Sequence, residues 1–280
     1  MTAPPAPARP AATVIVVRPA ATRPFEVLLV RRNDSVAFMA GAHVFPGGRV
    51  DAGDAAEPPD SCDGLDTLGR CADLAAGDEA RYRIAAIREL VEEAGVLLAR
   101  RSQTFVDRPT ADVIRAGLGA RASLVAHLAS HGLRTALDAV VPFAHWVTPE
   151  IETRRFDTRF LLARMPDTQE ATHDGGETTA LDWLAPVDAL ARAHRGEIKL
   201  PPPTWTTLQQ LQALTSIDDA WTWASTAPIV RIQPGFFEEE GRTVLTLPGD
   251  PTYPAPPGVE PLPITRFELV ADRGWRPVER

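Results

Sequence analysis

Hydrophobic positions along the chain follow two different periods, and together they predict a mixture of strands and helices. Runs of β-branched and aliphatic residues at 12–20 and 25–33, separated by proline and polar residues, predict two strands. Similar runs predict further strands at 140–149, 153–166, 179–186, 242–248 and 264–271. Spacings of three and four residues predict helices at 78–95, 187–198 and 204–224, and two more within 110–140. Because both kinds of element are intermixed, the predicted fold class is α/β or α+β.

The segment RIAAIRELVEEAGVLL, residues 83–98, is the most informative of the predicted helices. Its apolar side chains fall on one side of a helical wheel: Ile84, Ile87, Leu90 and Val91. Glu89, Glu92 and Glu93 fall on the opposite side, three and four residues apart. Like charges at these spacings repel by roughly a few tenths of a kcal/mol per pair. We therefore expect a positive charge to compensate them.

Carboxylates grouped in this way point to a divalent cation. Mg²⁺ and similar hard ions prefer oxygen ligands, and they commonly bind one or two carboxylates together with substrate phosphates. A Pro46-Gly47-Gly48 loop precedes the helix, and glycine lets a backbone carbonyl approach an ion closely. Arg88 is placed to pair with one carboxylate and fix its rotamer. The alternative is an acidic helix face that contacts only solvent.

Composition and charge narrow the classes of function. The chain has 280 residues with a net charge of −8, which excludes non-specific binding to a nucleic-acid polymer. An anionic small substrate remains compatible with a local cation or arginine cluster. No apolar run approaches the roughly 18 residues of a membrane span, and the N-terminus lacks a secretory signal pattern. We therefore expect no membrane contact and a cytoplasmic location. Cys62 and Cys71 match no zinc spacing and are too few for a disulfide framework.

The glutamate cluster has the spacing of a known motif. Residues 88–96 match the second half of the Nudix box, G-x5-E-x7-R-E-U-x-E-E-x-G-U, in which U is aliphatic. The first half begins at Gly48, with Asp54 at the place of the first glutamate. The chain thus resembles the Nudix hydrolases, with residues 55–77 inserted between the two halves. A loop insertion of this length adds little closure entropy, so the site can survive it. Glu79, near the helix start, is an alternative to Asp54.

Three further segments narrow the resemblance. AFMAGAHVFPGG, WVTPEIETRRFDTRFLL and KLPPPTW are similar to segments of the coenzyme A diphosphatases, a Nudix subgroup of mammalian peroxisomes and of bacteria. The resemblance implies an α/β/α sandwich around a mixed sheet, and hydrolysis of a nucleoside diphosphate linked to another moiety. The leading substrate is coenzyme A or acyl-CoA, which would give 3′,5′-ADP and 4′-phosphopantetheine or its acyl form. NADH, ADP-ribose and a non-catalytic Nudix-fold binding or regulatory module are the alternatives. A peroxisomal location is not implied, because the sequence ends in PVER.

The resemblance also implies roles for residues of the motif. Glu92 and Glu93 would ligate Mg²⁺ or Mn²⁺. Glu89 would either ligate the metal as well or act as the base for the attacking water. Arg88 would orient Glu89, and Gly48 would offer its carbonyl to the metal.

Several candidates lie outside the motif. Glu177 is either a further carboxylate near the metal or a turn residue. Arg154, Arg155 and Arg159 are candidates for phosphate contacts, because arginine binds phosphate bidentately. Alternation along a strand would place Arg155 and Arg159 on one face and Arg154 on the other. His43, just before the glycine loop, is either a substrate contact or a structural histidine.

The expected organisation is one Nudix domain with additions. Residues 1–11, rich in proline and alanine, form a disordered lead-in. Residues 12–200 form the domain, with the loop insertion at 55–77 and a helical insertion at 110–140. Residues 201–280 form an extension of helices and strands packed on the same domain. The sequence is compatible with a homodimer.

Overall fold

The computed structural model describes residues 5–34, 39–119, 122–173, 178–253, 262–271 and 273–278. The strands are β1 (Arg9–Arg18), β2 (Glu26–Arg32), β3 (His43–Val44), β4 (Gly47–Arg49), β5 (Cys62–Asp63), β6 (Ala99–Arg101), β7 (Thr104–Phe105), β8 (Arg134–Ala136), β9 (Val140–Val147), β10 (Phe156–Arg164), β11 (Thr178–Leu184), β12 (Arg231–Ile232), β13 (Gly235–Glu239), β14 (Arg242–Thr246), β15 (Arg266–Val270) and β16 (Gly274–Pro277). The α-helices are α1 (Ala76–Ala94), α2 (Arg108–Gly117), α3 (Leu124–Ser130), α4 (Pro186–Arg195), α5 (Pro202–Gln212) and α6 (Ile217–Thr226), and short 3₁₀ turns are η1 (Pro59–Ser61), η2 (Leu65–Thr67) and η3 (Leu137–Ala139).

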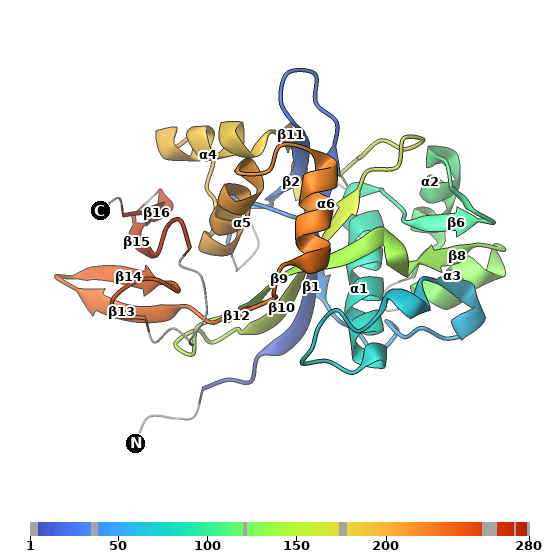
Figure 1. Cartoon of the computed structure of the whole chain (residues 1–280), viewed down its shortest axis with the longest axis horizontal. Helices are drawn as coiled ribbons and strands as arrows, with labels where there is room; N and C mark the ends of the chain where they lie inside the picture. The colour runs from blue at the N-terminus through green and yellow to red at the C-terminus, as the bar shows by residue number, and fades with distance from the viewer. Residues whose placement is uncertain are drawn as a thin grey trace.

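A mixed sheet forms the middle layer of the molecule (Figure 1). Its strand order is β11-β2-β1-β10-β9-β12, with β3 paired to β2 and β4 paired to β1. Strand β1 runs parallel to β10 and antiparallel to β2. Val14 and Val16 of β1 belong to one hydrophobic core, whereas Ile15 and Val17 belong to another. This uninterrupted apolar run therefore forms a strand that is buried on both faces.

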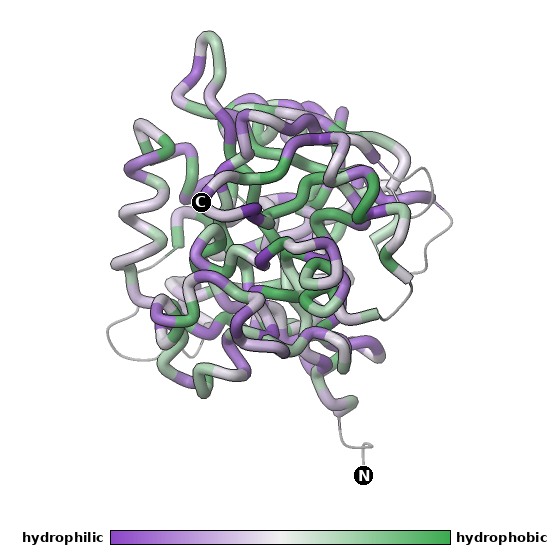
Figure 2. The backbone as a smooth tube through the Cα atoms, turned by 90° about the vertical axis from the view of Figure 1, so that its right-hand side faces the viewer, coloured by the Kyte–Doolittle hydropathy of each residue, from purple (hydrophilic) through white to green (hydrophobic). Residues whose placement is uncertain are grey.

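Helices cover both faces of the sheet. Side chains of α1, α2 and α3 pack in the core that contains Val14. Side chains of α4, α5 and α6 pack in the core that contains Ile15. Hydrophobic segments gather inside the tube in Figure 2, and hydrophilic segments lie mostly on the outer turns. The expected α/β/α sandwich around a mixed sheet is confirmed.

The N-terminal strand begins earlier than the hydrophobic pattern predicts. Residues 9–11 are already paired with 156–158 of β10, and the Arg9 amide donates to the Arg155 carbonyl at 2.9 Å. Backbone pairing needs no apolar side chain, so the sequence pattern does not register these residues. The expectation of disorder throughout 1–11 is therefore wrong for residues 9–11.

The 55–77 insertion is more ordered than an irregular loop. It contains η1, β5 and η2, and β5 pairs in parallel with β8. The two helices expected within 110–140 are present as α2 and α3, but residues 134–136 form β8 rather than helix. That strand exists because β5 and β6 pair with it from either side, which is a tertiary contact that local spacing does not reveal.

The single helix expected at 204–224 is two helices. Helix α5 ends at Gln212, and Ser216 then caps α6 by accepting a hydrogen bond from the Asp219 amide at 3.0 Å. Serine is favoured at this position because its hydroxyl satisfies an amide that the helix leaves unpaired. The strands predicted at 242–248 and 264–271 are confirmed as β14 and β15.

Strands β13 to β16 form a separate C-terminal sheet in the order β13-β14-β15-β16. Phe267 of β15 meets Trp205 of α5 edge-to-face, with ring centroids 6.3 Å apart. The buried Asp250 carboxylate accepts from Arg266 at 3.0 Å, and these charge-assisted bonds lower the pKa of Asp250 to about 2 although burial opposes that shift. The extension is thus fixed to the α5 side of the main sheet.

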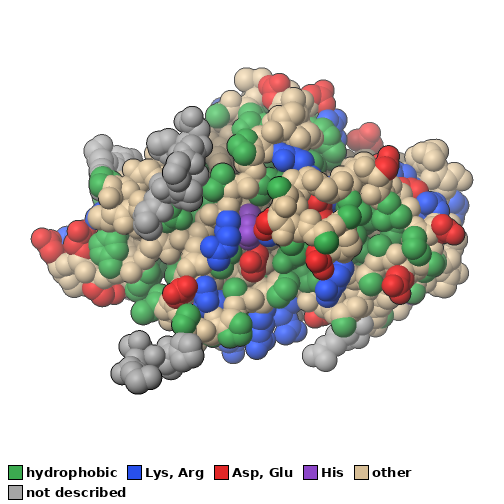
Figure 3. All heavy atoms as spheres, turned by 60° about the horizontal axis from the view of Figure 1, so that its bottom comes forward, with side chains coloured by type: hydrophobic (Ala, Val, Ile, Leu, Met, Phe, Trp, Pro, Cys, Tyr) green, Lys and Arg blue, Asp and Glu red, His purple; other side chains and the backbone are tan. Residues whose placement is uncertain are grey.

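Two surface properties follow from the described residues. Among them, no helix has both the length and the apolar character needed to cross a bilayer. On the face in Figure 3, acidic, basic and hydrophobic side chains lie side by side.

Candidate active site

Helix α1 brings the charged residues of the box to one surface, as its spacing predicts. Ile84, Ile87, Leu90 and Val91 are fully buried against the sheet. Of the glutamates, Glu92 keeps 36% of its side chain exposed and Glu89 keeps 14%, whereas Glu93 is buried. Gly95 ends the helix at φ 66°, a left-handed conformation that glycine adopts without strain.

Arg88 is the hub of the cluster. Its guanidinium binds Asp54 bidentately, from Nε at 2.8 Å and from Nη2 at 3.0 Å. Nη1 donates to Glu89 at 2.8 Å and to Glu92 at 3.0 Å. Nη2 also donates to the Arg49 carbonyl at 2.8 Å. One buried arginine therefore fixes three carboxylates and the strand of the glycine loop.

The glycine loop lies directly against the glutamates. The Gly47 amide donates to Glu93 Oε2 at 3.0 Å. A Cβ on Gly48 would come within 2.3 Å of Glu89 Oε1, so only glycine leaves room for that carboxylate. Strand β4 holds both glycines by pairing with β1, in which Gly48 faces Ala12.

Burial dominates the electrostatics of the cluster. Desolvation raises the pKa of Glu89 to about 7, and Arg88 only partly offsets it. The pKa of Glu92 is raised for the same reason. Burial alone would lower the pKa of Arg88, but its bond to Asp54 and the charge of Glu89 outweigh that, so the net shift is upward. Ionising these carboxylates therefore has a desolvation cost that Arg88 offsets only in part.

The donor set fits a hard divalent cation. Glu89, Glu92 and Glu93 come from two turns of α1 and line the same cavity, and the Gly48 backbone lies against Glu89 without a side chain between. Within the described ranges, however, no three acidic, histidine or cysteine side chains converge as a ready-made metal cluster. Arg88 instead binds Glu89 and Glu92. A metal ion that binds these two carboxylates would therefore have to replace part of their contact with Arg88.

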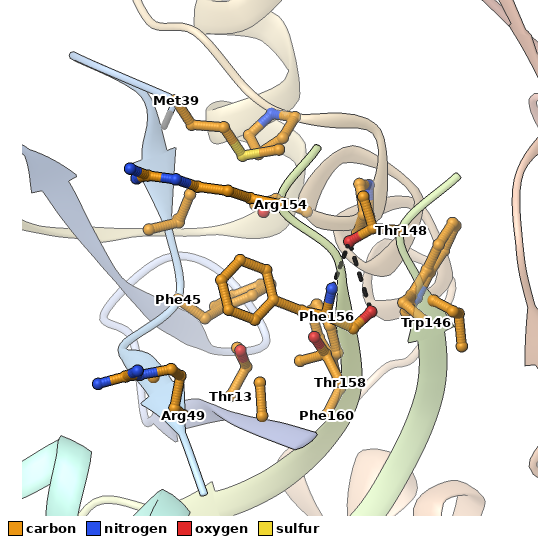
Figure 4. A pocket seen from close by; sticks show the side chains of 18 of the residues that line it. Thr13, Met39, Phe45, Arg49, Trp146, Thr148, Arg154, Phe156, Thr158 and Phe160 are labelled. Carbon is orange, nitrogen blue, oxygen red and sulfur yellow. Dashed lines mark hydrogen bonds between the residues drawn. The ribbon is translucent and has the colours of Figure 1, made fainter. Parts of the chain in front are cut away.

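A cavity of about 960 Å³ opens beside the cluster (Figure 4). That size is at the upper end of the roughly 300–1,000 Å³ typical of small-molecule sites. Glu89, Glu92 and Glu93 line one part of it. Strands line it with Thr13, Trp146, Phe156, Thr158 and Phe160, and Phe45 lines it from the link between β3 and β4. A further part is apolar and includes Pro201, Pro202, Pro203, Pro234, Phe236, Leu245 and Trp275. The lining also has charged side chains outside α1, namely Arg32, Arg49, Asp51, Glu152 and Arg154.

Asp54 and Glu79 compete for the place of the first box glutamate, and the structure brings only Asp54 to Arg88. Glu79 is buried, and its carboxylate accepts from the amides of Gly69 at 3.0 Å and Cys71 at 2.9 Å. It also accepts from Arg83 at 2.6 Å. Glu79 therefore binds the insertion to α1 rather than joining the acidic cluster. Glu177 lies outside the described residues.

The three candidate arginines divide between two sides of the chain, as alternation predicts. Arg159 binds Asp73 of the insertion bidentately, at 2.9 and 2.5 Å. Arg155 is buried and donates to the carbonyls of Thr148 and Ala6. Neither lines the described part of the cavity, whereas Arg154 does. The expected division holds: Arg154 lines the cavity together with Phe156, Thr158 and Phe160, whereas Arg155 and Arg159 lie on the other side. Because Arg155 and Arg159 bond to other parts of the chain, phosphate contacts by these two arginines are not supported.

His43 is a structural histidine. It is buried and pairs with Asp182 of β11 at 3.2 Å through Nε2. Burial lowers the pKa of His43, although Asp182 opposes that shift. Among the described lining residues of the cavity His43 does not appear, so the expected substrate contact is not supported.

Sequence reasoning did not single out several lining residues. Arg49 and Asp51 stand in the FPGGRVDAGD segment, and Arg32 ends β2. Trp146 was expected in a strand and lines the cavity from β9. Arg49 and Asp51 could have been found from the sequence, because they lie next to Gly48 of the box. No spacing rule connects Arg32 or Trp146 to the glutamates of α1, so the sequence does not identify these two as lining residues.

The sandwich, with its glycine loop and glutamate-bearing helix, is that of a Nudix hydrolase. The model of the NUDT19 Nudix domain family matches residues 59–211, so the chain belongs to that family. The predictions of the Nudix family and of an enzyme are thereby confirmed.

Individual relatives agree with this assignment. The human protein named acyl-coenzyme A diphosphatase NUDT19 is 30% identical over 251 residues, covering 75% of this chain and 67% of the relative. The protein of the same name from Xenopus laevis is 27% identical over 280 residues, covering 84% of this chain and 73% of the relative. The crystal structure of a Nudix hydrolase from Alicyclobacillus acidocaldarius superposes with a TM-score of 0.69 and 33% identity, covering 79% of this chain and 99% of that chain.

Proposed function

We propose that the enzyme hydrolyses the diphosphate of coenzyme A or an acyl-CoA with Mg²⁺ or Mn²⁺, giving 3′,5′-ADP and 4′-phosphopantetheine or its acyl form. One observation carries the proposal: a single cavity of about 960 Å³ runs from the α1 carboxylates to an apolar wall. A substrate with a charged nucleotide part and an uncharged arm matches those two environments. The names of the human and frog relatives support the same substrate class.

The metal would be held by Glu89, Glu92, Glu93 and the Gly48 carbonyl. Bound there, it would supply Lewis-acid stabilisation of the diphosphate and a more acidic water. Glu89 either joins the ligands or accepts a proton from the attacking water at its carboxylate. The pKa of about 7 that burial gives this group suits proton transfer near neutral pH.

Arg88 acts on the reaction by holding other residues in place. Its bonds to Glu89 and Glu92 set the direction of both carboxylates, while the bidentate bond to Asp54 fixes the guanidinium itself. Asp54 is thus a positioning residue, and the Asp51 amide holds it in turn at 2.7 Å. Asp54 thus stands at the place of the first box glutamate, and its role there is to hold the Arg88 guanidinium.

Arginines on the cavity would neutralise the phosphates of the substrate. Arg154 lies above Phe45 and Arg49 lies below it in Figure 4, and Arg32 lines the cavity from the end of β2. Guanidinium groups bind phosphate oxygens in pairs of hydrogen bonds. They would create a locally positive surface on a chain with a net charge of −8.

We extend the proposal to the location and assembly of the protein. We place the enzyme in the cytoplasm, because Cys62 and Cys71 are free and buried, as suits a reducing compartment. A homodimer stays a prediction that size measurement in solution would check.

Turnover of a substrate panel tests the proposed function. Purified protein with Mg²⁺ or Mn²⁺ would be incubated with coenzyme A, acyl-CoA, NADH and ADP-ribose, and the products separated by chromatography. We expect coenzyme A and acyl-CoA to release 3′,5′-ADP. We also expect kcat/KM for these two substrates to exceed kcat/KM for NADH and for ADP-ribose. Faster turnover of NADH or ADP-ribose would overturn the substrate class but keep the chemistry. No turnover with either metal would favour a non-catalytic binding module.

A further inference from the structure

We propose that the C-terminal sheet forms the binding wall for the acyl chain of acyl-CoA and thereby favours acylated over free coenzyme A. This inference rests on the proposed function, since it assigns one part of the substrate to one part of the cavity. The family match ends at residue 211, so the wall comes from chain outside the matched Nudix domain.

Alternation along β13 carries the assignment. Phe236 lines the cavity, and its cross-strand partner Leu245 on β14 lines it too. The next residue, Phe237, points to the other side of the strand, where the Arg266 guanidinium lies 5.5 Å from its ring centroid. Trp275 of β16 extends the same apolar surface. One face of the sheet is therefore turned to the cavity and one is not.

The wall lies far along the cavity from the charged cluster. In Figure 1, β13 and β14 lie on one side of β1, β9 and β10, whereas α1 lies on the other. The described lining residues of the C-terminal sheet are all apolar, in contrast to the glutamates and Arg88 at the α1 end. Burying an alkyl chain against such a wall is favourable, whereas a phosphate would lose its hydration there without a partner.

The wall is held rigidly enough to select a ligand. Phe267 and Leu247 of this part are fully buried in the core that contains Trp205 of α5. Arg276 donates to the Ala193 carbonyl at the end of α4. The polyproline segment 201–203, which begins α5, lines the cavity between the wall and the main sheet. A rigid wall loses little entropy when a flexible chain binds it.

The experiment compares Phe236→Ala with Phe237→Ala, which removes the same ring from the opposite face of the strand. Both variants and the wild type would be assayed for kcat/KM with free coenzyme A and with a long-chain acyl-CoA. Binding of the acyl-CoA to metal-free protein would be measured separately by calorimetry. We expect Phe236→Ala to lower kcat/KM and affinity for the acyl-CoA roughly tenfold and to leave free coenzyme A within about twofold. Phe237→Ala should leave kcat/KM for both substrates and the affinity for the acyl-CoA unchanged.

The results separate this inference from the proposed function. An equal loss of kcat/KM for coenzyme A and acyl-CoA in Phe236→Ala would overturn the assignment of the wall to the acyl chain. Phe236 would then contact a part that both substrates share, such as the adenine. No change in either variant would overturn it as well, while hydrolysis by the wild type would leave the proposed function standing. Binding of acyl-CoA that depends on Phe236, without hydrolysis by the wild type, would support the wall and overturn the function. Absence of both binding and hydrolysis would overturn both.

Discussion

Arg88 supplies part of the compensation that the clustered glutamates require. From the sequence alone, we expect a bound cation to compensate the three glutamates, because they lie together on one helical face. In the structure, Nη1 of Arg88 already bridges Glu89 and Glu92, and Asp54 holds the rest of the guanidinium. Desolvation still raises the pKa of Glu89, so the internal compensation is incomplete. The remaining negative charge is what a divalent cation would balance.

Gly48 gives a residue-scale prediction that leaves the ionic groups unchanged. Gly48→Ala should lower kcat roughly a hundredfold, because its Cβ would displace the Glu89 carboxylate. Gly77→Ala on α1 is the matched control, since a Cβ there meets nothing within 4 Å. Steady-state kinetics with melting curves for both variants measure the effect. Normal turnover by folded Gly48→Ala protein would contradict the close approach.

Glu89 gives a prediction about pH. Its pKa is about 7 in the folded protein against an ordinary value of 4.5, so ionisation opposes folding. The contribution of Glu89 to the stability of the metal-free protein should fall as pH rises from 4.5 through 7, and it should be fully lost above 7. Glu89→Gln removes that penalty and keeps an acceptor for Arg88. We expect the variant to be more stable at pH 8 by roughly 1–3 kcal/mol and nearly equal to wild type at pH 4.5.

Urea unfolding in the presence of a chelator measures this difference at both pH values. A stability gap of the same size at pH 4.5 and pH 8 would contradict the raised pKa.

The spacing of the box predicts that Arg88, Glu89 and Glu92 form one cluster, and Arg88 bonds to both glutamates. Asp54 bonds to Arg88 as well, whereas the sequence leaves that place open between Asp54 and Glu79. Strand alternation predicts that Arg154 is separated from Arg155 and Arg159, and Arg154 is the one of these three that lines the cavity. Charge and spacing do not show which face of the strand meets the cavity, so they do not single out Arg154.

At the scale of elements, the insertion is fastened to the helix that carries the site. Glu79 accepts from two amides of the insertion, and Arg83 donates to the Thr67 carbonyl at 2.9 Å. Asp73 binds Arg159 of β10, and this bond lowers the pKa of Asp73. A long insertion therefore does not loosen the box, because it is tied to α1 and to the sheet.

The Glu79–Arg83 pair gives the prediction at this scale. Glu79 keeps 1% and Arg83 keeps 2% of the side chain exposed, so Glu79→Ala leaves a buried charge without its carboxylate. We expect a loss of roughly 3–5 kcal/mol in the free energy of unfolding. The exposed neighbour Asp78 is the control, and Asp78→Ala should cost less than about 1 kcal/mol. Similar losses for both in denaturant titrations would contradict the role of Glu79.

Elements with strong local patterns were predicted, and those made by tertiary pairing were not. The apolar runs of β1, β9 and β10 and the helical spacing of α1 and α4 identify these elements from the sequence. Strand β8 is three residues long and depends on β5 and β6. The break between α5 and α6 depends on the capping Ser216, which a search for long helical periods passes over.

For the whole molecule, the cavity combines two regions that are distant in sequence. The charged end comes from the loop and helix of the Nudix domain, and the apolar end comes from residues beyond 200. Packing of α5 against both the main sheet and the C-terminal sheet brings them together. The sequence predicts that the extension packs on the domain but not which of its faces meets the cavity. That depends on the register of β13 and β14.

The most direct test of the central claim is release of 3′,5′-ADP from acyl-CoA by wild type and Glu92→Gln, each with Mg²⁺ and with a chelator. Glu170→Gln is the control, because that glutamate is 84% exposed and pairs with Arg108 on the surface. We predict release only with Mg²⁺, full activity of Glu170→Gln, and a loss of at least about a hundredfold in Glu92→Gln. Undiminished release by folded Glu92→Gln protein, or release in the chelator, would contradict a metal-dependent site on α1.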